Sequence, residues 1–458
     1  MSVPKIDELL GMGVYATETV GIGGVIRESM NDFLVEEVLV DGSKARIEEV
    51  LKNRVLGATR VEQRYLLCVL VKRNWETFIT LRNIAKQLGI SQRRIQIAGI
   101  KDAKAVTAQF VTVENCSFDD ISKISVRDLE VRPIGYVRDS LSPYFLLGNS
   151  FAIRIKAIRF SESTVEKRLA ETVQRLDAIG GIPNFFGHQR FGTTRPITHL
   201  VGEAIVKANF EEAAMLFLAK PSVHEHPSSK QARKELQSTR NFKQALQDFP
   251  KQLRFEKIML RHLVENPGDF VGAFGRLPVK LQRFFVHAHQ SYLFNRFLSE
   301  RIKNGISLNE AEVGDFVLNI ERSGLPMFQT AKVADSKNIS EVNKLIKTGR
   351  MRVALPLIGF RQRLSKGAMG RIEQEILNEE SVETSNFELE AAPGMSGGGG
   401  LRAVVTPLRE FHMFGSKTCE TNRKELHANL NFMLLRGSYA TVLLREVMKP
   451  NDPIHSGF

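Results

Sequence analysis

Residues 151–181 read FAIRIKAIRFSESTVEKRLAETVQRLDAIGG and decide the fold class. The first part, 151–160, alternates apolar with other side chains, which is typical of a strand with one buried face. The rest predicts a helix, because Ser163 and Glu166 have the spacing of a capping box and apolar residues then recur along one side. That side is formed by Val165, Leu169, Val173 and Leu176. A strand that leads directly into a helix indicates a mixed α/β domain.

The same alternation of strands and helices extends toward the N-terminus. Phe33 lies in a predicted strand, and the apolar run YLLCVLVKR (65–73) predicts a buried one. WETFITLRNIAKQLGI (75–90) has helical spacing, with Gly89 where a helix C-cap is expected. AQFVTVEN (108–115) alternates like a further strand.

The pattern changes in the middle of the chain. Helical periodicity dominates from about residue 196 to about 303, and strand-like pieces follow at 316–320 and 352–360. Alternating strands return near the C-terminus, which indicates a domain that is interrupted by an insertion. We therefore predict a first domain made of residues 1–181 and 401–458, with an inserted α+β domain at 182–400.

The segment EAAPGMSGGGG (390–400) is the most glycine-rich part of the chain. The run Gly397–Gly400 does not end in GK[ST] and does not follow a buried strand, so it does not predict a phosphate-binding loop. Its composition favours a flexible hinge at the end of the insertion.

The charge of the chain favours a polyanionic partner. The 458 residues include 64 Lys and Arg against 51 Asp and Glu, which gives a formal charge of +13 and a pI near 9.6. Nucleic acid is the usual partner of such a protein.

Metal binding, disulfide bonds and membrane insertion are not expected. Three scattered cysteines form no CxxC pair, and the histidines at 224, 226, 287 and 289 lack the spacing of a zinc site. The N-terminus lacks the pattern of a signal peptide, and no apolar run is long enough to span a membrane. We expect a cytoplasmic protein that does not contact membranes.

Asp102 is the first candidate site residue. It lies in AGIKDAKAVTAQ (98–109), between Lys101 and Lys104, and nearby cations favour the ionised form of its carboxylate. An aspartate after Gly-x-Lys is either a turn residue or a nucleophile, and the local pattern leaves both open.

Two further stretches suit a nucleotide. In GNSF (148–151), Asn149 and Phe151 share one face of a predicted strand and would offer an amide and a ring to a uracil. NFFGHQRFG (184–192) combines aromatic rings with Arg190 and contains no acid, which suits stacked bases and phosphates.

Together these residues resemble the TruD-type tRNA pseudouridine synthases. AGIKDAKAVTAQ is similar to the signature GxKDxxAxTxQ of that family. The other similar blocks follow in family order and span about residues 14–447: NDFLVEE (31–37), VKRNWET (71–77), GNSF (148–151), PNFFGHQRFG (183–192), HQSYLFN (289–295) and LLRGSYATVLLRE (434–446).

The resemblance implies a fold, a reaction and a set of site residues. The fold is the mixed α/β sheet of the pseudouridine synthases with the family's insertion domain, and the reaction isomerises uridine 13 of a folded tRNA without metal or cofactor. We expect a monomer. Asp102 falls on the nucleophile position and Arg27 on that of its basic partner. The substrate-binding candidates are Phe33, Lys101, Gln109, Asn149, Phe151, Phe186 and Arg190.

This chain departs from the family pattern at two places. LLRGS replaces LPxGS, so that Arg436 is added and a proline is lost, and Phe185 stands where tyrosine is common. The first change affects the expected shape of a loop, and the second removes a hydroxyl while keeping a ring.

The chemistry needs few groups. The bond between N1 and C1′ breaks, the uracil turns, and C5 joins C1′. An ionised Asp102 could attack C1′ or abstract a sugar proton toward a glycal. The base must first leave the RNA stack, and Lys101, Lys104 and Arg190 would hold phosphates while it does. Two alternatives are a non-catalytic RNA-binding protein or tRNA-folding chaperone on the same fold, and a metal-dependent nuclease or phosphotransferase.

Overall fold

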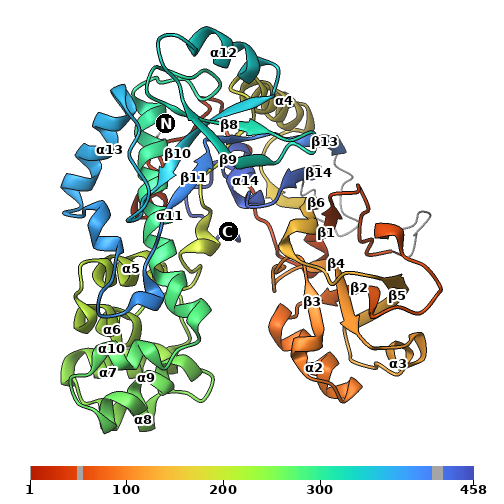
Figure 1. Ribbon diagram of the computed structural model, residues 1–458, viewed down its shortest axis with the longest axis vertical. Coiled ribbons are helices and arrows are strands. Elements are labelled where there is room, and N and C mark those ends of the chain that lie inside the picture. Colours follow the sequence, from red (N-terminus) through yellow and green to blue (C-terminus); the bar gives the residue numbers. More distant parts are fainter. Residues whose placement is uncertain (1, 49–54, 415–425) are drawn as a thin grey trace.

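A computed structural model describes residues 2–48, 55–414 and 426–458. Figure 1 shows two arms that meet at one end of the molecule. One arm carries β2 (Tyr65–Arg73) to β5 (Leu129–Val137), and the other carries α5 (Thr198–Val206) to α10 (Phe270–Gly275). The C-terminus lies between the arms in this view.

The described residues form a mixed sheet of eight strands, which confirms the predicted α/β class. The strand order is β13-β14-β6-β1-β4-β2-β5, with β3 paired to β4. β1 and β4 are parallel, whereas β14 runs antiparallel to β6 and so returns the C-terminal part of the chain to the sheet. The bounds not yet given are β1 (Phe33–Leu39), β3 (Ile95–Ile97), β4 (Val106–Glu114), β6 (Leu146–Ile158), β13 (Arg409–Phe414) and β14 (Leu426–Leu435).

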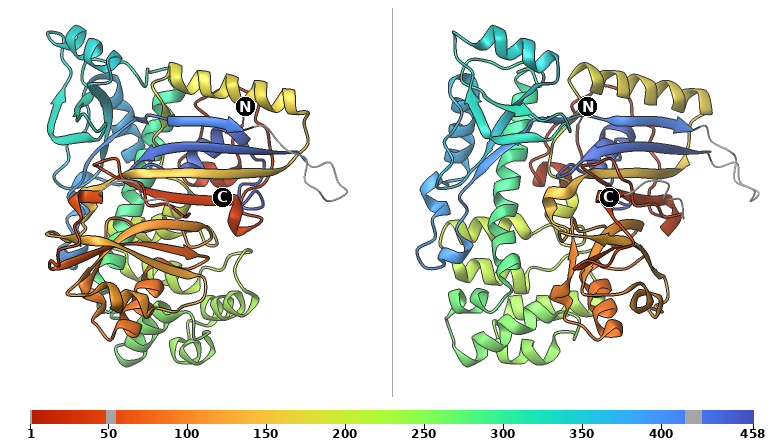
Figure 2. Two further views of the ribbon diagram at one scale, coloured as in Figure 1. Left: turned by 90° about the vertical axis from the view of Figure 1, so that its right-hand side faces the viewer. Right: turned by 45° about the vertical axis from the view of Figure 1, so that its right-hand side comes forward.

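Several helices of the described residues pack on or beside this sheet. α4 (Glu162–Ala178), the yellow helix of Figure 2, runs alongside the strands and shares a core with α14 (Ala440–Met448). α2 (Thr77–Leu88) ends at Gly89, which has the predicted left-handed conformation (φ 64°). The predicted cap of α4 was two residues too late, because Ser161, and not Ser163, accepts the hydrogen bond of the first turn.

The proposed insertion begins with the short strand β7 (Ile182–Pro183), continues with helices and ends in a second sheet. Among the described residues this sheet has four strands in the order β11-β10-β8-β9. The division at residues 181 and 400 remains our proposal, and strand pairing carries the second sheet on to Ala403. The remaining elements are α1 (Lys5–Leu9), α3 (Phe118–Ser122), β7 (Ile182–Pro183), α6 (Phe210–Ala219), α7 (Pro227–Thr239), α8 (Phe242–Asp248), α9 (Arg254–Glu265), α11 (Val279–Lys303), β8 (Phe316–Ile320), β9 (Pro326–Val333), α12 (Ile339–Lys347), β10 (Met351–Leu357), α13 (Gly367–Glu379), β11 (Gly400–Ala403) and β12 (Val405–Thr406).

The glycine run at 397–400 is packed, so the prediction of a flexible hinge was wrong. The main-chain oxygens of Gly397 and Gly398 accept hydrogen bonds from the amides of Phe360 (3.1 Å) and Arg361 (3.2 Å). A Cβ on Gly359 would lie 2.2 Å from the nitrogen of Gly399. The glycines therefore serve a close approach of two backbone segments, for which side chains leave no room.

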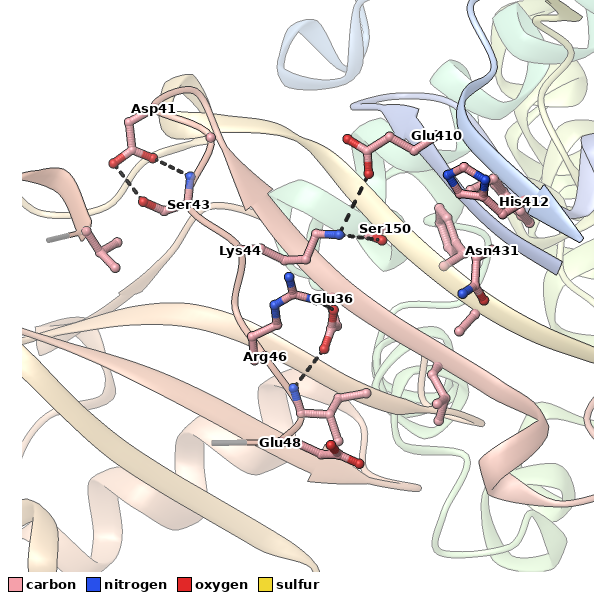
Figure 3. A pocket seen from close by; sticks show the side chains of 17 residues that line it. Glu36, Asp41, Ser43, Lys44, Arg46, Glu48, Ser150, Glu410, His412 and Asn431 are labelled. Atoms are coloured by element: carbon pink, nitrogen blue, oxygen red, sulfur yellow. Dashed lines mark hydrogen bonds and ion pairs between the residues drawn. The ribbon is translucent and has the colours of Figure 1, made fainter. Parts of the chain in front are cut away.

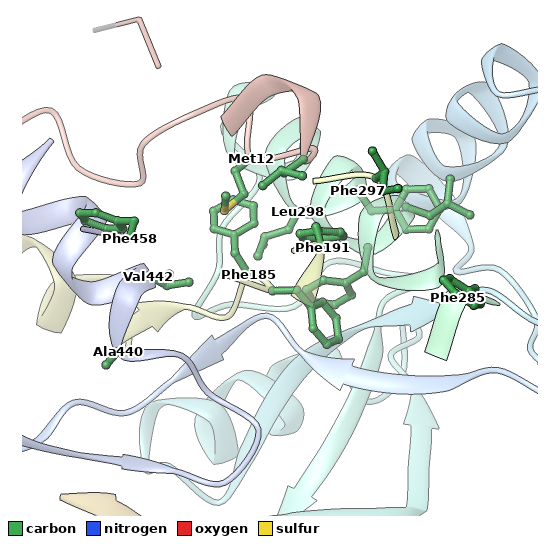
Figure 4. Close-up of a cluster of buried hydrophobic side chains, with 14 of the residues drawn as sticks. Met12, Phe185, Phe191, Phe285, Phe297, Leu298, Ala440, Val442 and Phe458 are labelled. Carbon is green, nitrogen blue, oxygen red and sulfur yellow. The ribbon is translucent and has the colours of Figure 1, made fainter. Parts of the chain in front are cut away.

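One continuous apolar core joins the insertion to the first domain. Figure 4 shows Phe185, Phe191 and Leu298 from the insertion beside side chains from both ends of the chain. Met12 comes from the N-terminal segment, and Phe458 comes from the C-terminus. The arms therefore meet over a continuous buried core.

Candidate active site

A pocket of about 170 Å³ collects most of the predicted site residues. Its walls come from β1, the loop between β3 and β4, β6, the short helix His188–Arg190 and the start of α14. It is lined by Arg27, Phe33, Val35, Ile100, Lys101, Asp102, Asn149, Phe151, Gln189, Ser438, Tyr439, Ala440 and Thr441. Segments far apart in the sequence therefore meet at Asp102.

Asp102 and Arg27 form an ion pair at the opening of this pocket. The Asp102 side chain is 40% exposed, and its Oδ2 lies 3.3 Å from Nη2 of Arg27, whose side chain is 11% exposed. Burial lowers the pKa of the Arg27 guanidinium and the Asp102 charge opposes that shift. The Asp102 carboxylate therefore has a cation on one side and solvent on the other.

Two side-chain contacts and an unusual backbone conformation hold Arg27 in place. Its Nη1 donates to the main-chain oxygen of Gly457 (3.0 Å), and its guanidinium carbon lies 4.0 Å from the ring centre of Phe33. Its backbone has a positive φ of 61°, which is uncommon for a residue with a side chain. The cation that faces Asp102 is therefore held in place.

The backbone of the Asp102 loop is anchored by groups from β2, α2 and β4. Lys72 Nζ donates to the main-chain oxygens of Asp102 (2.6 Å) and Trp75 (2.7 Å). Thr77 Oγ1 donates to the oxygen of Lys101 (3.1 Å), and Gln109 Nε2 donates to that of Gly99 (3.2 Å). Burial lowers the pKa of Lys72 to about 8.

Sequence reasoning missed the roles of Lys72 and Thr77. Both lie in VKRNWET (71–77), a stretch that resembles a family block but did not predict a role for either residue. The sequence shows a lysine and a threonine near the end of a predicted buried strand. No sequence pattern predicts that these two side chains contact the Asp102 loop.

Two predicted substrate contacts lie inside the protein instead. The ammonium of Lys101 forms a buried ion pair with Glu37 (2.5 Å), and both side chains are almost fully covered. Glu37 also accepts a hydrogen bond from the amide of Phe110 (2.9 Å). Gln109 is fully buried. In this structure Lys101 therefore pairs with Glu37 and Gln109 holds Gly99, so their contacts with the substrate stay predictions.

Asn149 and Phe151 lie as the strand pattern predicted, on the pocket face of β6. The ring of Phe151 stacks on Phe432 (5.2 Å between centroids) and meets Phe33 edge to face (6.2 Å). Asn149 Oδ1 is buried and has no hydrogen-bond partner among the described residues. A buried acceptor without a partner is costly, so its presence in a pocket indicates a ligand that donates to it.

In the described part of the chain, Phe186 and Arg190 do not line this pocket. Arg190 Nε donates to Ser291 Oγ (3.0 Å), and Phe186 is covered by the guanidinium of Arg402 at 4.0 Å. Gln189, the residue just before Arg190, lines the pocket and accepts a hydrogen bond from Thr441 Oγ1 (3.0 Å). The sequence therefore predicted that the block NFFGHQRFG belongs to the site, but it did not predict which side chain of the block enters the pocket.

A larger cavity of about 1030 Å³ lies on the opposite face of the sheet. Leu34 and Glu36 line it, whereas Phe33 and Val35 on the same strand line the Asp102 pocket. Figure 3 shows two ion pairs in it, Arg46 with Glu36 (3.2 Å) and Lys44 with Glu410 (3.9 Å), whereas Asp41 accepts hydrogen bonds from Ser43. The predicted residues Asp102, Arg27 and Asn149 line the smaller pocket and not this cavity, so we assign the site to the smaller pocket.

The described ranges hold neither a metal-binding cluster nor a membrane-spanning helix. Within residues 2–48, 55–414 and 426–458, no group of three or more His, Cys, Asp or Glu is placed to hold a metal ion. In the same ranges no helix has the length and apolar character needed to cross a membrane.

Comparison with known proteins decides the family. The sequence model of the family described as tRNA pseudouridine synthase D (TruD) matches residues 9–447. The chain belongs to this family. Proteins named "Probable tRNA pseudouridine synthase D" from Methanosarcina acetivorans and Pyrococcus abyssi are 40% and 36% identical over 454 and 435 residues. These matches cover 99% and 95% of this chain and 99% and 98% of the relatives.

A solved structure agrees with the TruD assignment. The crystal structure of the Methanosarcina mazei protein that carries the name tRNA pseudouridine synthase D (TruD) has a TM-score of 0.81 and 38% identity. It covers 98% of this chain and 99% of that one. The resemblance predicted from the sequence is thus confirmed, and with it the enzyme class, a tRNA pseudouridine synthase, which is an isomerase.

Proposed function

We propose that this TruD protein converts uridine 13 of a folded tRNA to pseudouridine, with Asp102 as the nucleophile. One observation carries the proposal. A half-exposed carboxylate, paired with Arg27 at 3.3 Å, lies at the opening of a pocket whose wall offers the unpartnered amide oxygen of Asn149. A carboxylate aimed by a fixed cation beside a base-sized pocket suits an attack on a nucleoside.

The pocket matches the chemistry of uracil. The N3–H of the base would donate to Asn149 Oδ1, which lacks a donor in the described protein. Phe33 and Phe151 give the same pocket an apolar floor, which suits the faces and edges of a pyrimidine ring. Hydrogen bonding to an edge together with an apolar surface is how proteins recognise a base outside a duplex.

The reaction can be written with this chain's own groups. The ionised carboxylate of Asp102 attacks C1′ as the N1–C1′ bond breaks, or it abstracts a sugar proton toward a glycal. In the first route the freed uracil turns in the pocket and the C1′–O bond to Asp102 breaks as C5 bonds to C1′, which releases the carboxylate. In the glycal route the sugar regains the proton that Asp102 took as C5 bonds to C1′. In both, the proton on C5 is finally lost to solvent while N1 gains one. Substrate and product have the same composition, so the balance requires no cofactor or metal.

The surroundings of the site support a folded RNA as the substrate. The chain carries a formal charge of +13, and Lys104 beside Asp102 is exposed, so both favour contact with phosphates. A uridine inside folded tRNA must leave its stack before C1′ is reached. We propose that the protein acts on it as a cytoplasmic monomer.

The decisive test is to incubate the purified protein with an unmodified tRNA transcript and to map pseudouridine by position. The wild type should modify uridine 13, and a transcript with cytidine at that position should stay unmodified. Asp102→Asn should lower the rate by at least about a thousandfold, because it removes the nucleophile and leaves the pocket intact. Loss of modification with tRNA binding retained also separates an enzyme from an RNA-binding protein. An active Asp102→Asn variant would contradict the assigned nucleophile.

A further inference from the structure

Ile100 is an exposed apolar side chain at the opening of the active-site pocket. It is 64% exposed and lines the same pocket as Asp102. Between the two, Lys101 points inward to Glu37. The loop therefore presents an isoleucine and the carboxylate on its outer side, and buries the residue between them.

The position of Ile100 is fixed by its neighbours. The main-chain oxygen of Gly99 accepts a hydrogen bond from Gln109 (3.2 Å). On the other side, the amide of Lys101 donates to Thr77 Oγ1 (3.3 Å) and its oxygen accepts from the same group (3.1 Å). With both flanking peptide units anchored, Ile100 cannot turn into the core, and its branched side chain has few rotamers.

We propose that Ile100 is a wedge that enters the RNA stack when the target uridine leaves it. The inference rests on the proposed function, because it concerns the nucleotides that flank the flipped base. A base that leaves a stack exposes the apolar faces of its neighbours, and an apolar side chain can cover them. Ile100 and Asp102 line the same pocket, so a nucleoside that meets the carboxylate brings the gap it leaves close to Ile100.

A chemically silent background tests the wedge directly. In Asp102→Asn protein no reaction occurs, and 2-aminopurine placed next to the target uridine in the tRNA reports unstacking by a rise in fluorescence. We expect a clear rise with Asp102→Asn alone. Adding Ile100→Ala should reduce that rise at least about threefold, with the dissociation constant for tRNA changed less, whereas Ile100→Leu should restore it. An undiminished rise with Ile100→Ala would overturn the proposal.

Val61→Ala in the same background is a matched control. Val61 is 73% exposed and precedes β2. In the β2–β4 pairing, Arg73 pairs with Val106, near Asp102, and Tyr65 pairs with Glu114 at the opposite end. Val61 therefore lies beyond the end that is remote from the pocket, and its replacement should leave the fluorescence unchanged. An equal loss with Val61→Ala would also overturn the assignment to Ile100.

Turnover by the intact enzyme gives a second readout. With Asp102 present, Ile100→Ala should lower the single-turnover rate on tRNA about tenfold. The rate should fall by a smaller factor on a transcript in which the target uridine is already unpaired. An equal loss on both transcripts would place Ile100 in base binding rather than wedging. Failure of the wild type to form pseudouridine would instead refute the proposed function, so the two failures are distinguishable.

Discussion

At the scale of single residues, Lys72 shows how a buried cation can shape an active site without touching the substrate. Its Nζ lies under the loop and donates to the oxygens of Asp102 and Trp75. Burial lowers its pKa to about 8, while the charges of Asp102 and Glu76 oppose the shift. A lysine that is protonated at pH 7 therefore loses its charge in a range where the enzyme can still be assayed.

We expect a pH profile that depends on Lys72. As the pH rises through about 8, the ammonium becomes neutral, its hold on the Asp102 peptide weakens, and kcat at saturating tRNA should fall. Lys72→Arg keeps a cation at this position and should move the fall to higher pH. Lys72→Met should lower kcat about tenfold or more, since it removes charged hydrogen bonds of about 1.5–3 kcal/mol.

Measurements of kcat from pH 6.5 to 9.5, with tRNA affinity checked at each pH, test this expectation. Titration of the uracil itself is common to all variants, so a difference in profile isolates Lys72. Identical profiles for the wild type and Lys72→Arg would contradict it, and melting temperatures would show whether each variant is folded.

At the scale of elements, α13 carries a buried acid that the reaction does not use. Glu373 is fully buried and accepts hydrogen bonds from the amide (2.8 Å) and Oγ (2.7 Å) of Ser365. Burial raises its pKa to about 7 from an ordinary value of 4.5. The two hydrogen bonds oppose the shift but do not cancel it.

Glu373 should make the insertion less stable as the pH rises. Because its pKa is higher in the folded state, its contribution is full below about pH 4.5 and is lost as the pH rises through about 7. The difference corresponds to on the order of 3 kcal/mol. Denaturation at pH 5 and pH 8 should show a smaller pH dependence for Glu373→Gln than for the wild type. Glu375→Gln, at an exposed position of the same helix, should behave as the wild type.

Elements that depend on local chemistry could be predicted from the sequence, and those that depend on distant partners could not. The bounds of β8 follow from the residue pattern of that stretch. The end of α2 follows from the left-handed backbone conformation of Gly89. The glycine run at 397–400 has the composition of a linker, but Gly359 and its neighbours lie against it. Composition alone cannot reveal a close approach between segments that are far apart in the chain.

The same distinction applies to the site. Asp102, Arg27, Asn149 and Phe151 could be placed through family blocks and strand alternation, and the structure brings them together. The orientation of Lys101 could not be foreseen, because it is decided by Glu37 on a different strand. Which side of a loop a lysine takes depends on the acid that the fold places nearby.

At the scale of the whole molecule, a buried charged network joins three distant parts of the chain. Asp7 in α1 lies 2.7 Å from Nε2 of His188, at the start of the insertion, and 2.5 Å from Nε of Arg445 in α14. Arg445 also donates to the main-chain oxygens of Met12 and Val14. Asp7 and Arg445 are fully buried, so each depends on the other for its compensating charge.

Removal of the Asp7 charge should therefore destabilise the molecule where its arms meet. Asp7→Asn leaves the Arg445 guanidinium buried with Glu446, at 3.5 Å, as its remaining acid. We expect the free energy of unfolding to fall by about 3–5 kcal/mol, because one partner of a buried pair is lost and the other is not. Asp452→Asn breaks an exposed pair with His455 (2.6 Å) and should change it by less than about 1 kcal/mol.

Chemical denaturation of the two variants, with pseudouridine formation assayed well below the melting temperature, separates stability from catalysis. Asp7 does not line the Asp102 pocket, so Asp7→Asn protein that remains folded should retain its rate. Equal stability of the two variants would show that the apolar core alone holds the arms together. A stable but inactive Asp7→Asn protein would instead show that the network sets the geometry of the site, since His188 and Arg445 belong to the same short elements as Gln189 and Thr441, which line the pocket.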